Sequence, residues 1–434
     1  MALLYTFYGD DFTGSTDVLE QLASNGVPAV LFLGVPTNEH LARFPQVQAV
    51  GIAGDSRSRS PEWMSEHLPD IFARLREFQA PVAHYKVCST FDSAPAHGSI
   101  GRAMEIGQEV FGPTFVPIVV GAPHLRRYIA FGNLFASAPD GRVHRIDRHP
   151  MSRHPVTPMQ EPDLRLHLAR QTATPIGLID TPMLQAGAAP EELARLLAEG
   201  KQAVLFDTID YATQATVGKL LWGEAQRQPI FSTASSGLTA ALIFAWQEAR
   251  MIPQAAPAVA VEPCSPLLVV SGSCSAATER QLRYALSHGY HGIPLDPSAL
   301  LDPVTSLATR EAVIEEAEET LAAGRDTIFY TALGLPSEPA HGDQLGQALG
   351  DLLCELLERT AVRRVLLCGG DTSSHAVQRL GLYALTWAAD LQPGAPLCRA
   401  HADSPLDGLE LVLKGGQVGT DDFFDVVRGS SLRS

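Results

Sequence analysis

The sequence predicts an α/β protein of two domains with mainly parallel sheets, and three observations predict it. Short apolar runs alternate with Gly/Ser/Asp loops and amphipathic helical stretches, a pattern typical of parallel strands covered by helices on both faces. The 434 residues are too many for one small core and suffice for two or three compact domains. Residues 252–266 are rich in Ala and Pro, lack helical periodicity and are interpreted as a linker. The expected domains are therefore residues 1–251 and 267–434.

Buried strands are expected where the apolar runs are shortest and best bounded. These runs are residues 28–33, 48–53, 115–121, 202–206, 266–270, 327–331, 363–368 and 409–413. Helices are expected between many of them, for example at residues 190–199 and 342–359. Residues 131–163 carry many Pro, Arg and His residues and are expected to form an irregular excursion inside the first domain.

The composition excludes several classes of protein. The net charge of −16 disfavours a nucleic-acid partner, because phosphate backbones are bound mainly through Lys and Arg. No apolar run approaches the roughly 18 residues of a membrane span, and the start MALLYTFYGDD lacks the basic region of a secretory signal. The six cysteines form no CxxC pair, which favours scattered thiols and a cytoplasmic location.

Residues 3–26 begin with a strand that ends in two acids, Asp10 and Asp11, and continue into a helix that Thr13 or Ser15 is expected to cap. Ligands of open parallel sheets gather at the carboxyl ends of the strands. Two adjacent carboxylates there could hold substrate hydroxyls, or one could act as a base. The alternative is that the acids and threonine serve only as helix caps.

A second polar cluster follows two later strands of the first half. Arg57 lies in DSRSR, and Lys86, Ser89, Thr90 and Asp92 lie in YKVCSTFDSAP. A sugar acid needs a cation for its carboxylate and polar partners for its alcohols, and these side chains with the two aspartates of the first loop meet both needs. The alternative for the two cations is a solvated surface position.

Three strand–loop–helix segments in the second half could cradle phosphates. Small residues let the backbone approach an anion closely, and a helix that starts there presents unpaired N–H groups. One loop alone is equally well an ordinary capped turn, but three in one half of the chain favour a nucleotide site. Its candidate residues are Ser273 in VVSGSCS, Gly369, Gly370, Asp371 and Thr372 in CGGDTSS, and Gly416 in LKGGQVGTDDFF.

Absent motifs narrow the function further. The chain has no GxxxxGK[ST], no GxGxxG followed by an acid, no HExxH and no GxSxG, which excludes a Walker-type NTPase and weakens a dinucleotide-dependent reading. His149 and His154 could ligate a metal, but their Pro and Arg neighbours favour structural or substrate contacts. No metal ligands are assigned.

The order of eight motifs resembles that of the four-carbon acid sugar kinase family. GDDFTGSTD, SRS, YKVCSTFDS, HPVTPM, SSGLTAAL, VVSGSCS, CGGDTSS and LKGGQVGTDDFF extend from about residue 8 to residue 424, nearly the whole chain. The resemblance implies an N-terminal α/β domain that binds a sugar acid and a C-terminal one that binds ATP. It also implies an active site in the cleft between them, where a terminal hydroxyl of the acid is phosphorylated with Mg²⁺ bridging the phosphates of ATP.

Carried over by position, the family's substrate residues are Asp10, Asp11, Arg57, Lys86 and the segment Ser89–Asp92. Its nucleotide residues are Ser273, Gly369, Gly370, Asp371, Thr372 and Gly416. The base is expected among Asp10, Asp11 and Asp92, without a choice between them.

Some residues depart from the family's pattern. Gly9 stands where the family often has Ala, and Asp371 stands where it often has Glu. Residues 122–136 are unusual for the family, so the acid stays open between four-carbon acids and a branched acid such as 3-oxo-isoapionate. Two rival functions are a nucleotide- and metabolite-binding sensor without transfer and a nicotinamide-dependent oxidoreductase. A homo-oligomer is left open.

Overall fold

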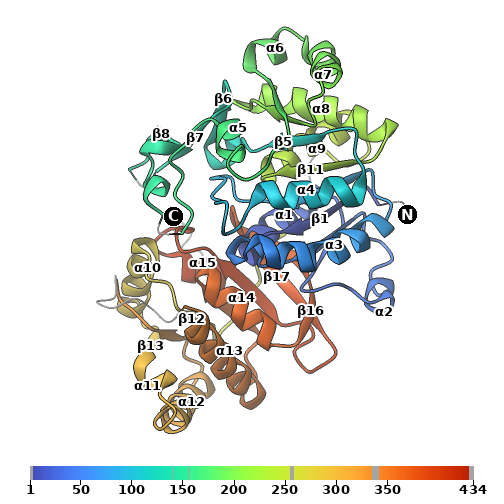
Figure 1. Ribbon diagram of the computed structural model, residues 1–434. Helices are drawn as coiled ribbons and strands as arrows, with labels where there is room; N and C mark the ends of the chain where they lie inside the picture. The colour runs from blue at the N-terminus through green and yellow to red at the C-terminus, as the bar shows by residue number, and fades with distance from the viewer. Residues whose placement is uncertain (1–2, 139, 155, 255–258, 335–341, 430–434) are drawn as a thin grey trace. The chain divides into compact units, whose positions relative to one another are not determined.

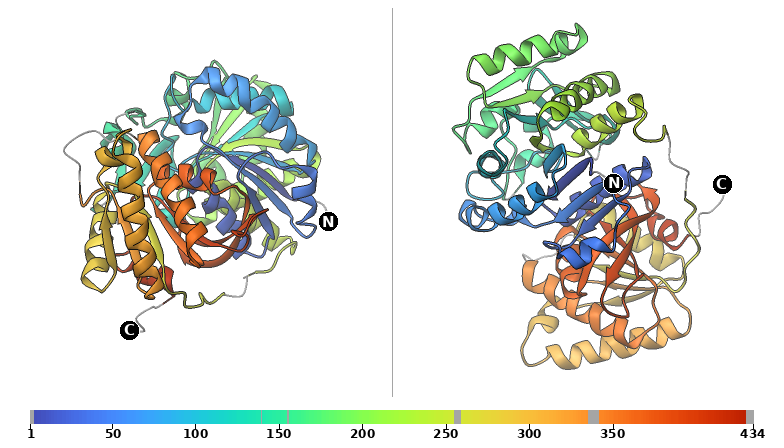
Figure 2. Two further views of the ribbon diagram at one scale, coloured as in Figure 1. Left: turned by 90° about the horizontal axis from the view of Figure 1, so that it is seen from below. Right: turned by 90° about the vertical axis from the view of Figure 1, so that its right-hand side faces the viewer.

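The computed structural model describes residues 3–138, 140–154, 156–254, 259–334 and 342–429, without the side chains of Asp343 and Asp371. The chain divides into two compact units (Figures 1 and 2). The first comprises Met1–Val30 and Gly34–Ala256, and the second comprises Leu31–Leu33 and Pro257–Ser434. Within the expected linker at residues 252–266, residues 255–258 lie outside the described part of the chain.

The sheet of the first unit is parallel at the strands that carry the polar loops. β1 (Tyr5–Gly9) pairs with β3 (Ala49–Ala53) on one side and with β4 (Val82–Lys86) on the other. β4 then pairs with β11 (Ile230–Ala234), and β11 with β5 (Val116–Val119). In this register Gly9 lies opposite both Ala53 and Lys86, so three strands end level at one edge. The outer strands are β2 (Ala29–Phe32) beside β3, and β10 (Ala203–Phe206) and β9 (Ile176–Ile179) beyond β5.

Helices cover both faces of this sheet, because alternate residues of each strand point to opposite sides. The ring of Tyr5 meets Trp246 of α9 (Ser236–Glu248), whereas the ring of Tyr8 meets Phe72 of α3 (Pro61–Glu77). The faces are completed by α1 (Phe12–Ser24) and α8 (Tyr211–Arg227), which contact α9, and by α4 (Ile100–Phe111), which contacts α3. The shorter helices are α2 (Asn38–Ala42), α5 (Leu164–Leu168), α6 (Thr181–Gln185) and α7 (Ala189–Ala198), with 3₁₀ turns η1 (Ser56–Ser58), η2 (Pro123–Leu125), η3 (Ile146–Arg148) and η4 (Pro150–Arg153).

The expected irregular excursion is wrong in part, since it contains regular structure. β6 (Arg127–Ala130), β7 (Asn133–Ser137) and β8 (Val143–Arg145) form a separate antiparallel sheet. Leu134 and Ala136 of β7 are buried while their neighbours are half-exposed, and the polar composition of the segment hid this short alternation. Pro139 and Pro155 of the excursion lie outside the described residues.

The second unit has a mixed sheet whose parallel part carries the glycine loops. Its order is β13 (His291–Pro294), β14 (Thr327–Tyr330), β12 (Leu268–Ser271), β15 (Arg364–Cys368) and β18 (Glu410–Lys414), all parallel. β18 then pairs antiparallel with β17 (Ala395–Ala402), and β17 with β16 (Leu382–Gln392). The helices are α10 (Ala276–Ser287), α11 (Pro297–Leu301), α12 (Ser306–Ala322), α13 (Gly342–Arg359), α14 (Gly370–Arg379) and α15 (Phe423–Arg428).

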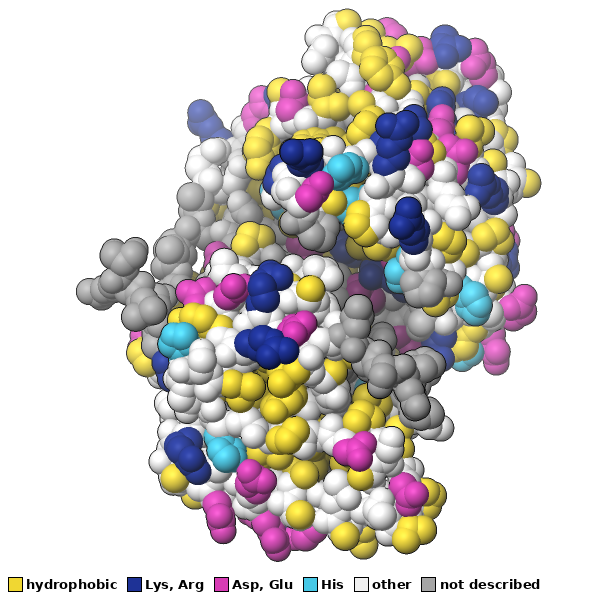
Figure 3. All heavy atoms as spheres, turned by 90° about the vertical axis from the view of Figure 1, so that its left-hand side faces the viewer, with side chains coloured by type: hydrophobic (Ala, Val, Ile, Leu, Met, Phe, Trp, Pro, Cys, Tyr) yellow, Lys and Arg dark blue, Asp and Glu magenta, His cyan; other side chains and the backbone are white. Residues whose placement is uncertain are grey.

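The predicted fold class is confirmed: both units are α/β, and most strand pairs are parallel. All eight expected strands are present, with ends shifted by at most two residues. The helices expected at residues 190–199 and 342–359 are present as well, the second with the same bounds. The face drawn in Figure 3 carries basic, acidic and apolar side chains intermixed. Within the described ranges, no helix combines the length and apolar character that crossing a bilayer requires.

Candidate active site

The polar loops of the first unit meet at the carboxyl edge of its sheet. The backbone N–H of Asp10 donates to the carbonyl oxygen of Lys86 at 2.9 Å, and that of Arg57 donates to the carbonyl oxygen of Asp10 at 3.0 Å. Asp10 follows β1, Arg57 lies in η1 after β3, and Lys86 ends β4. The parallel register therefore brings together three residues that are far apart in the sequence.

Arg57 binds both acids of the first loop. Its Nε and Nη2 donate to Asp10 at 3.1 and 2.6 Å, and its Nη1 and Nη2 donate to Asp11 at 2.9 Å each. Asp11 also accepts from the backbone N–H of Gly14 and caps α1, so the expected cap at Thr13 or Ser15 is wrong. Asp11 precedes the first helical residue and so occupies the cap position, whereas Thr13 already lies inside the helix.

The electrostatics differ between the two partners of this cluster. Burial raises the pKa of Asp10 to about 6, assisted by the charge of Asp11 and opposed by that of Arg57. Burial would lower the pKa of Arg57, but the two carboxylates outweigh it and hold that pKa above its usual value. Asp10 can thus exchange a proton near neutral pH while Arg57 stays charged.

Lys86 is almost fully buried, with 3% of its side chain exposed. Its nearest carboxylate oxygen is Oδ2 of Asp17 on α1, 4.0 Å from Nζ. Among the residues that the structure describes, no acceptor lies within hydrogen-bond distance of this Nζ. The ammonium group thus has a distant ion-pair partner, whereas the guanidinium of Arg57 has two close ones.

The loop after β4 holds the third candidate acid. Thr90 Oγ1 donates to Asp92 at 2.5 Å and lies 2.9 Å from Cys88 Sγ, while Ser89 is half-buried beside them. Burial opposes ionisation of Asp92, but Arg57 and Thr90 outweigh it and lower its pKa. Asp92 is thus a charged acceptor and a weaker base than Asp10.

The candidate nucleotide loops meet at the carboxyl edge of the second sheet. They follow β12, β15 and β18, which are neighbours in the sheet. A Cβ atom added to Gly416 would lie 3.1 Å from Ser273 Oγ, and one added to Gly369 would lie 3.5 Å from Ser273 Cβ. The three loops are therefore in contact, and small residues are required where they meet.

The N-terminus of α14 has no side-chain cap. Gly369 stands at the cap position with φ of +115°, a conformation that favours glycine, and Gly370 opens the helix. N–H groups in the first turn of a helix without a side-chain cap are suited to binding an anion. Asp371 lies in this turn by its backbone, and its side chain is outside the described part of the structure.

Lys414, at the end of β18, is a buried cation that was not among the predicted site residues. Its Nζ donates to Thr278 Oγ1 at 3.0 Å and to the carbonyl oxygen of Gly415 at 3.1 Å. Ser275 Oγ and Thr278 Oγ1 both donate to the carbonyl oxygen of Gly416. Burial lowers the pKa of Lys414. The lysine thus holds the Gly415–Gly416 loop against α10.

Two family models match the chain, one in each of its two compact units. Residues 5–242 match the model of a sugar-binding N-terminal domain, and residues 268–424 match that of a nucleotide-binding C-terminal domain. A 3-oxo-isoapionate kinase of Paraburkholderia graminis is 45% identical, with 99% of this chain and 95% of the relative covered. The chain belongs to the four-carbon acid sugar kinase family.

Further members of this family are more distant. A 3-oxo-tetronate kinase of Methylobacterium radiotolerans is 32% identical, with 98% of each chain covered. A crystal structure of a Haemophilus influenzae protein superposes with a TM-score of 0.72 at 26% identity, covering 98% of this chain and 100% of that one. The predicted family resemblance is therefore confirmed.

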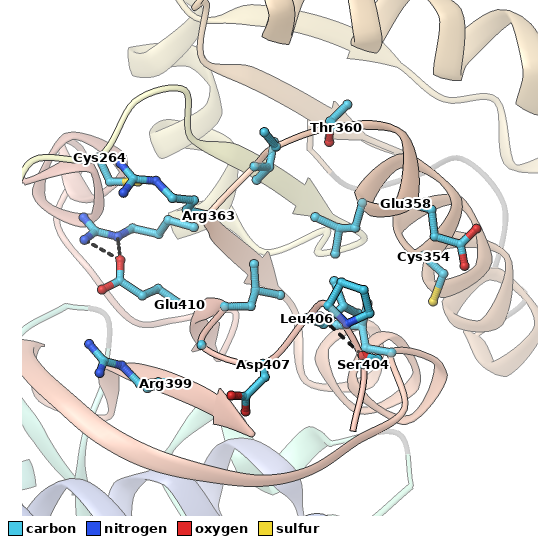
Figure 4. Close-up of a pocket in the computed structure, with 18 of the residues that line it drawn as sticks. Cys264, Cys354, Glu358, Thr360, Arg363, Arg399, Ser404, Leu406, Asp407 and Glu410 are labelled. Atoms are coloured by element: carbon cyan, nitrogen blue, oxygen red, sulfur yellow. Dashed lines mark hydrogen bonds and ion pairs between the residues drawn. The ribbon is translucent and has the colours of Figure 1, made fainter. Parts of the chain in front are cut away.

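A hollow of about 940 Å³ lies elsewhere in this family member, at the amino ends of β15 and β18 (Figure 4). Arg364 and Glu410 form an ion pair of 2.6 Å at its wall. Arg363, Arg399 and Asp407 also line it. The amino ends of parallel strands lie at one edge of a sheet and the carboxyl ends at the other. This hollow is therefore separate from the glycine loops, which follow the carboxyl ends.

Two other polar residues, Asp17 and His167, lie outside the predicted set. Asp17 escaped notice because it lies next to the apolar stripe of α1, and His167 because it is remote in sequence from its partner Ser93, 2.9 Å away. The predicted histidines make local contacts: His149 Nε2 donates to the carbonyl oxygen of Ser137 at 3.2 Å, and His154 Nδ1 accepts from the N–H of Thr157 at 3.1 Å. Within the described ranges no group of three or more His, Cys, Asp or Glu residues could hold a metal ion.

Proposed function

We propose that this chain is an ATP-dependent kinase that phosphorylates a terminal hydroxyl of a small sugar acid. One observation carries the proposal: each unit gathers a different class of ligand group at the carboxyl edge of its sheet. The first gathers buried charges, and the second gathers glycine loops and an open helix N-terminus. Charged side chains suit a hydroxylated acid, whereas backbone N–H groups suit phosphates.

The substrate class follows from the relatives. The 45%-identical relative is named for 3-oxo-isoapionate and several others for 3-oxo-tetronate. We therefore propose a four-carbon or branched five-carbon 3-oxo acid as the substrate, with 3-oxo-isoapionate first among the compounds to test.

In the proposed reaction, the substrate hydroxyl oxygen attacks the γ-phosphorus of ATP, and the bond from that phosphorus to the bridging oxygen of ADP breaks. Asp10 accepts the hydroxyl proton, because its pKa is raised to about 6 whereas that of Asp92 is lowered. Arg57 holds Asp10 and Asp11 in place, and Asp11 caps α1. Asp92, Ser89 and Thr90 would bind substrate hydroxyls.

On the nucleotide side, Gly369, Gly370 and Thr372 would surround the phosphates with Ser273 and Gly416. Asp371 is kept as a proposed nucleotide residue on the family pattern alone. ATP arrives with Mg²⁺ as part of the substrate, and the ion neutralises charge on the phosphates. A cytoplasmic location remains a prediction, and a homo-oligomer stays open.

A coupled assay of ADP release tests the proposal, with Mg-ATP and a panel of four- and five-carbon sugar acids and their 3-oxo forms. We expect strong turnover on one acid, with a phosphate monoester detected in the product by ³¹P NMR. ATP binding by calorimetry without turnover on the panel would favour the sensor, and absence of ATP binding would contradict both functions.

A further inference from the structure

Two arginines, Arg57 and Arg127, lie near the carboxyl edge of the first sheet, and they differ in the number of carboxylates that they contact. Arg57 donates to two carboxylates. Arg127, the first residue of β6, has no carboxylate within ion-pair distance among the residues that the structure describes. Burial lowers the pKa of Arg127, as expected for a cation whose charge is not compensated. An anionic ligand would supply the missing charge.

The Arg127 side chain is nevertheless held in place. Its Nη1 donates to the carbonyl oxygens of Leu125, Arg126 and Ser137 at 3.1, 3.4 and 3.2 Å. Its Nε is buried and has no partner in the described part of the chain. Its backbone exchanges two hydrogen bonds with Ala122, of 2.9 and 3.1 Å. Neutral carbonyl groups thus orient one side of the guanidinium, while Nε and Nη2 keep donors to offer.

Arg127 lies close to the proposed substrate loop. It follows η2, which leaves β5 at the same edge where β4 ends, and β5 and β4 are separated only by β11. Two strand spacings amount to about 10 Å. His124 of the same turn contacts the side-chain amide of Gln21 on α1 at 2.5 Å, so this turn reaches toward α1. The Cys88 thiol is near enough to influence the pKa of Arg127.

We propose that Arg127 binds the carboxylate of the sugar acid and so determines the preference for acids over neutral sugars. The inference rests on the proposed function and assigns its specificity to a residue outside the predicted set. A guanidinium offers two parallel N–H donors to a carboxylate, an arrangement that lysine cannot reproduce. Lys86 is then left for the reacting end of the substrate, where it lies beside Asp10.

The test compares Arg127→Gln, Arg127→Lys and the neighbouring control Arg126→Gln, whose wild-type side chain is exposed and donates to the carbonyl oxygen of Gly141. Each is assayed with 3-oxo-isoapionate and with its carboxamide. We expect Arg127→Gln to raise KM for the acid about 30-fold or more, with a much smaller change in kcat and little change for the amide. Arg127→Lys should recover part of the affinity, and Arg126→Gln should resemble the wild type.

Three results would overturn the inference. One is an unchanged KM for the acid in Arg127→Gln, and another is an equal loss for acid and amide, which would indicate a structural role. The third applies if Arg127→Gln does not fold, as judged from its melting temperature and its affinity for ATP. In that case, an Arg127→Lys enzyme that prefers the acid to the amide as strongly as the wild type would overturn the inference. A wild-type enzyme that turns over neither compound nor any acid of the panel would instead contradict the proposed function itself.

Discussion

The carboxyl edges of the two sheets use different chemistry for the same topological position. In the first unit, charged side chains from separate strands hold one another, as Arg57 holds Asp10 and Asp11. In the second, glycines and hydroxyl groups line the loops, and the principal charge, Lys414, is buried behind them. The first edge is therefore built from side chains and the second largely from backbone.

This difference indicates which substitutions should alter ligand binding in each unit. A site made of side chains changes its specificity when one residue changes, and each buried charge depends on its partners. A site made of backbone N–H groups recognises phosphate in any nucleotide and depends instead on local conformation. Substitutions should therefore separate into effects on the acid and effects on ATP.

The largest expected effect comes from the acid side. Asp10→Asn keeps the shape of the side chain but removes the base, and it leaves one oxygen in place of the two that accept from Arg57, so kcat should fall by about 10²- to 10⁴-fold. ATP affinity measured by calorimetry should not change, because Asp10 belongs to the first unit. The matched control is Asp55→Asn, whose wild-type carboxylate pairs with Arg59. Full turnover in Asp10→Asn would remove this residue from the mechanism.

The pH dependence should reveal the same carboxylate. Asp10 must be ionised to accept a proton, so kcat/KM should fall by about tenfold per pH unit below pH about 6. This raised pKa also means that protonated Asp10 favours the folded state at low pH, and this contribution disappears as the pH rises through about 6. A pH–rate profile of Asp92→Asn should keep the acid limb. An acid limb near pH 4 in the wild type would contradict the assignment.

On the nucleotide side, Gly369→Ala should raise KM for ATP by about tenfold, because alanine is strained at φ of +115° and would distort the helix N-terminus. KM for the acid should stay within about twofold, since the backbone loops belong to the other unit. The control is Gly394→Ala, also at positive φ (+83°) but with open space around its Cβ position. Equal effects of the two variants on ATP would show that general destabilisation, and not the loop, is measured.

The smallest expected effect distinguishes the placement of the Gly415–Gly416 loop from the stability of the fold. Lys414→Met should raise KM for ATP about fivefold, because the loss of Nζ removes the two hydrogen bonds that join the carbonyl oxygen of Gly415 to Thr278 of α10. The melting temperature should hold or rise, because methionine removes a buried charge that has no carboxylate partner among the described residues. A lower melting temperature with normal ATP kinetics would make Lys414 purely structural.

Much of the fold could be predicted because parallel strands buried on both faces leave strong local patterns. β15 and β18 are continuous apolar runs, and the expected ranges agree with them to within one residue. The small sheet of β6, β7 and β8 could not be predicted, because its strands are short and only β7 shows a clear alternation of burial. The cap of α1 was expected at Thr13 or Ser15, and capping by the aspartates was only the alternative. Several neighbouring residues can cap this helix, and only the backbone path selects Asp11.

The sequence by itself determined the α/β class, the family and the set of loops that follow strands, because these depend on local periodicity and on motif order. It could not determine how charges pair across strands. Only the tertiary structure showed that Arg57 binds Asp10 and Asp11 and that Lys86 lies 4.0 Å from Asp17. It also showed that Arg127, whose Nε is buried, has no carboxylate partner among the described residues. The physical reason is that pairing and burial are set by strand register, which joins residues 46 or more positions apart.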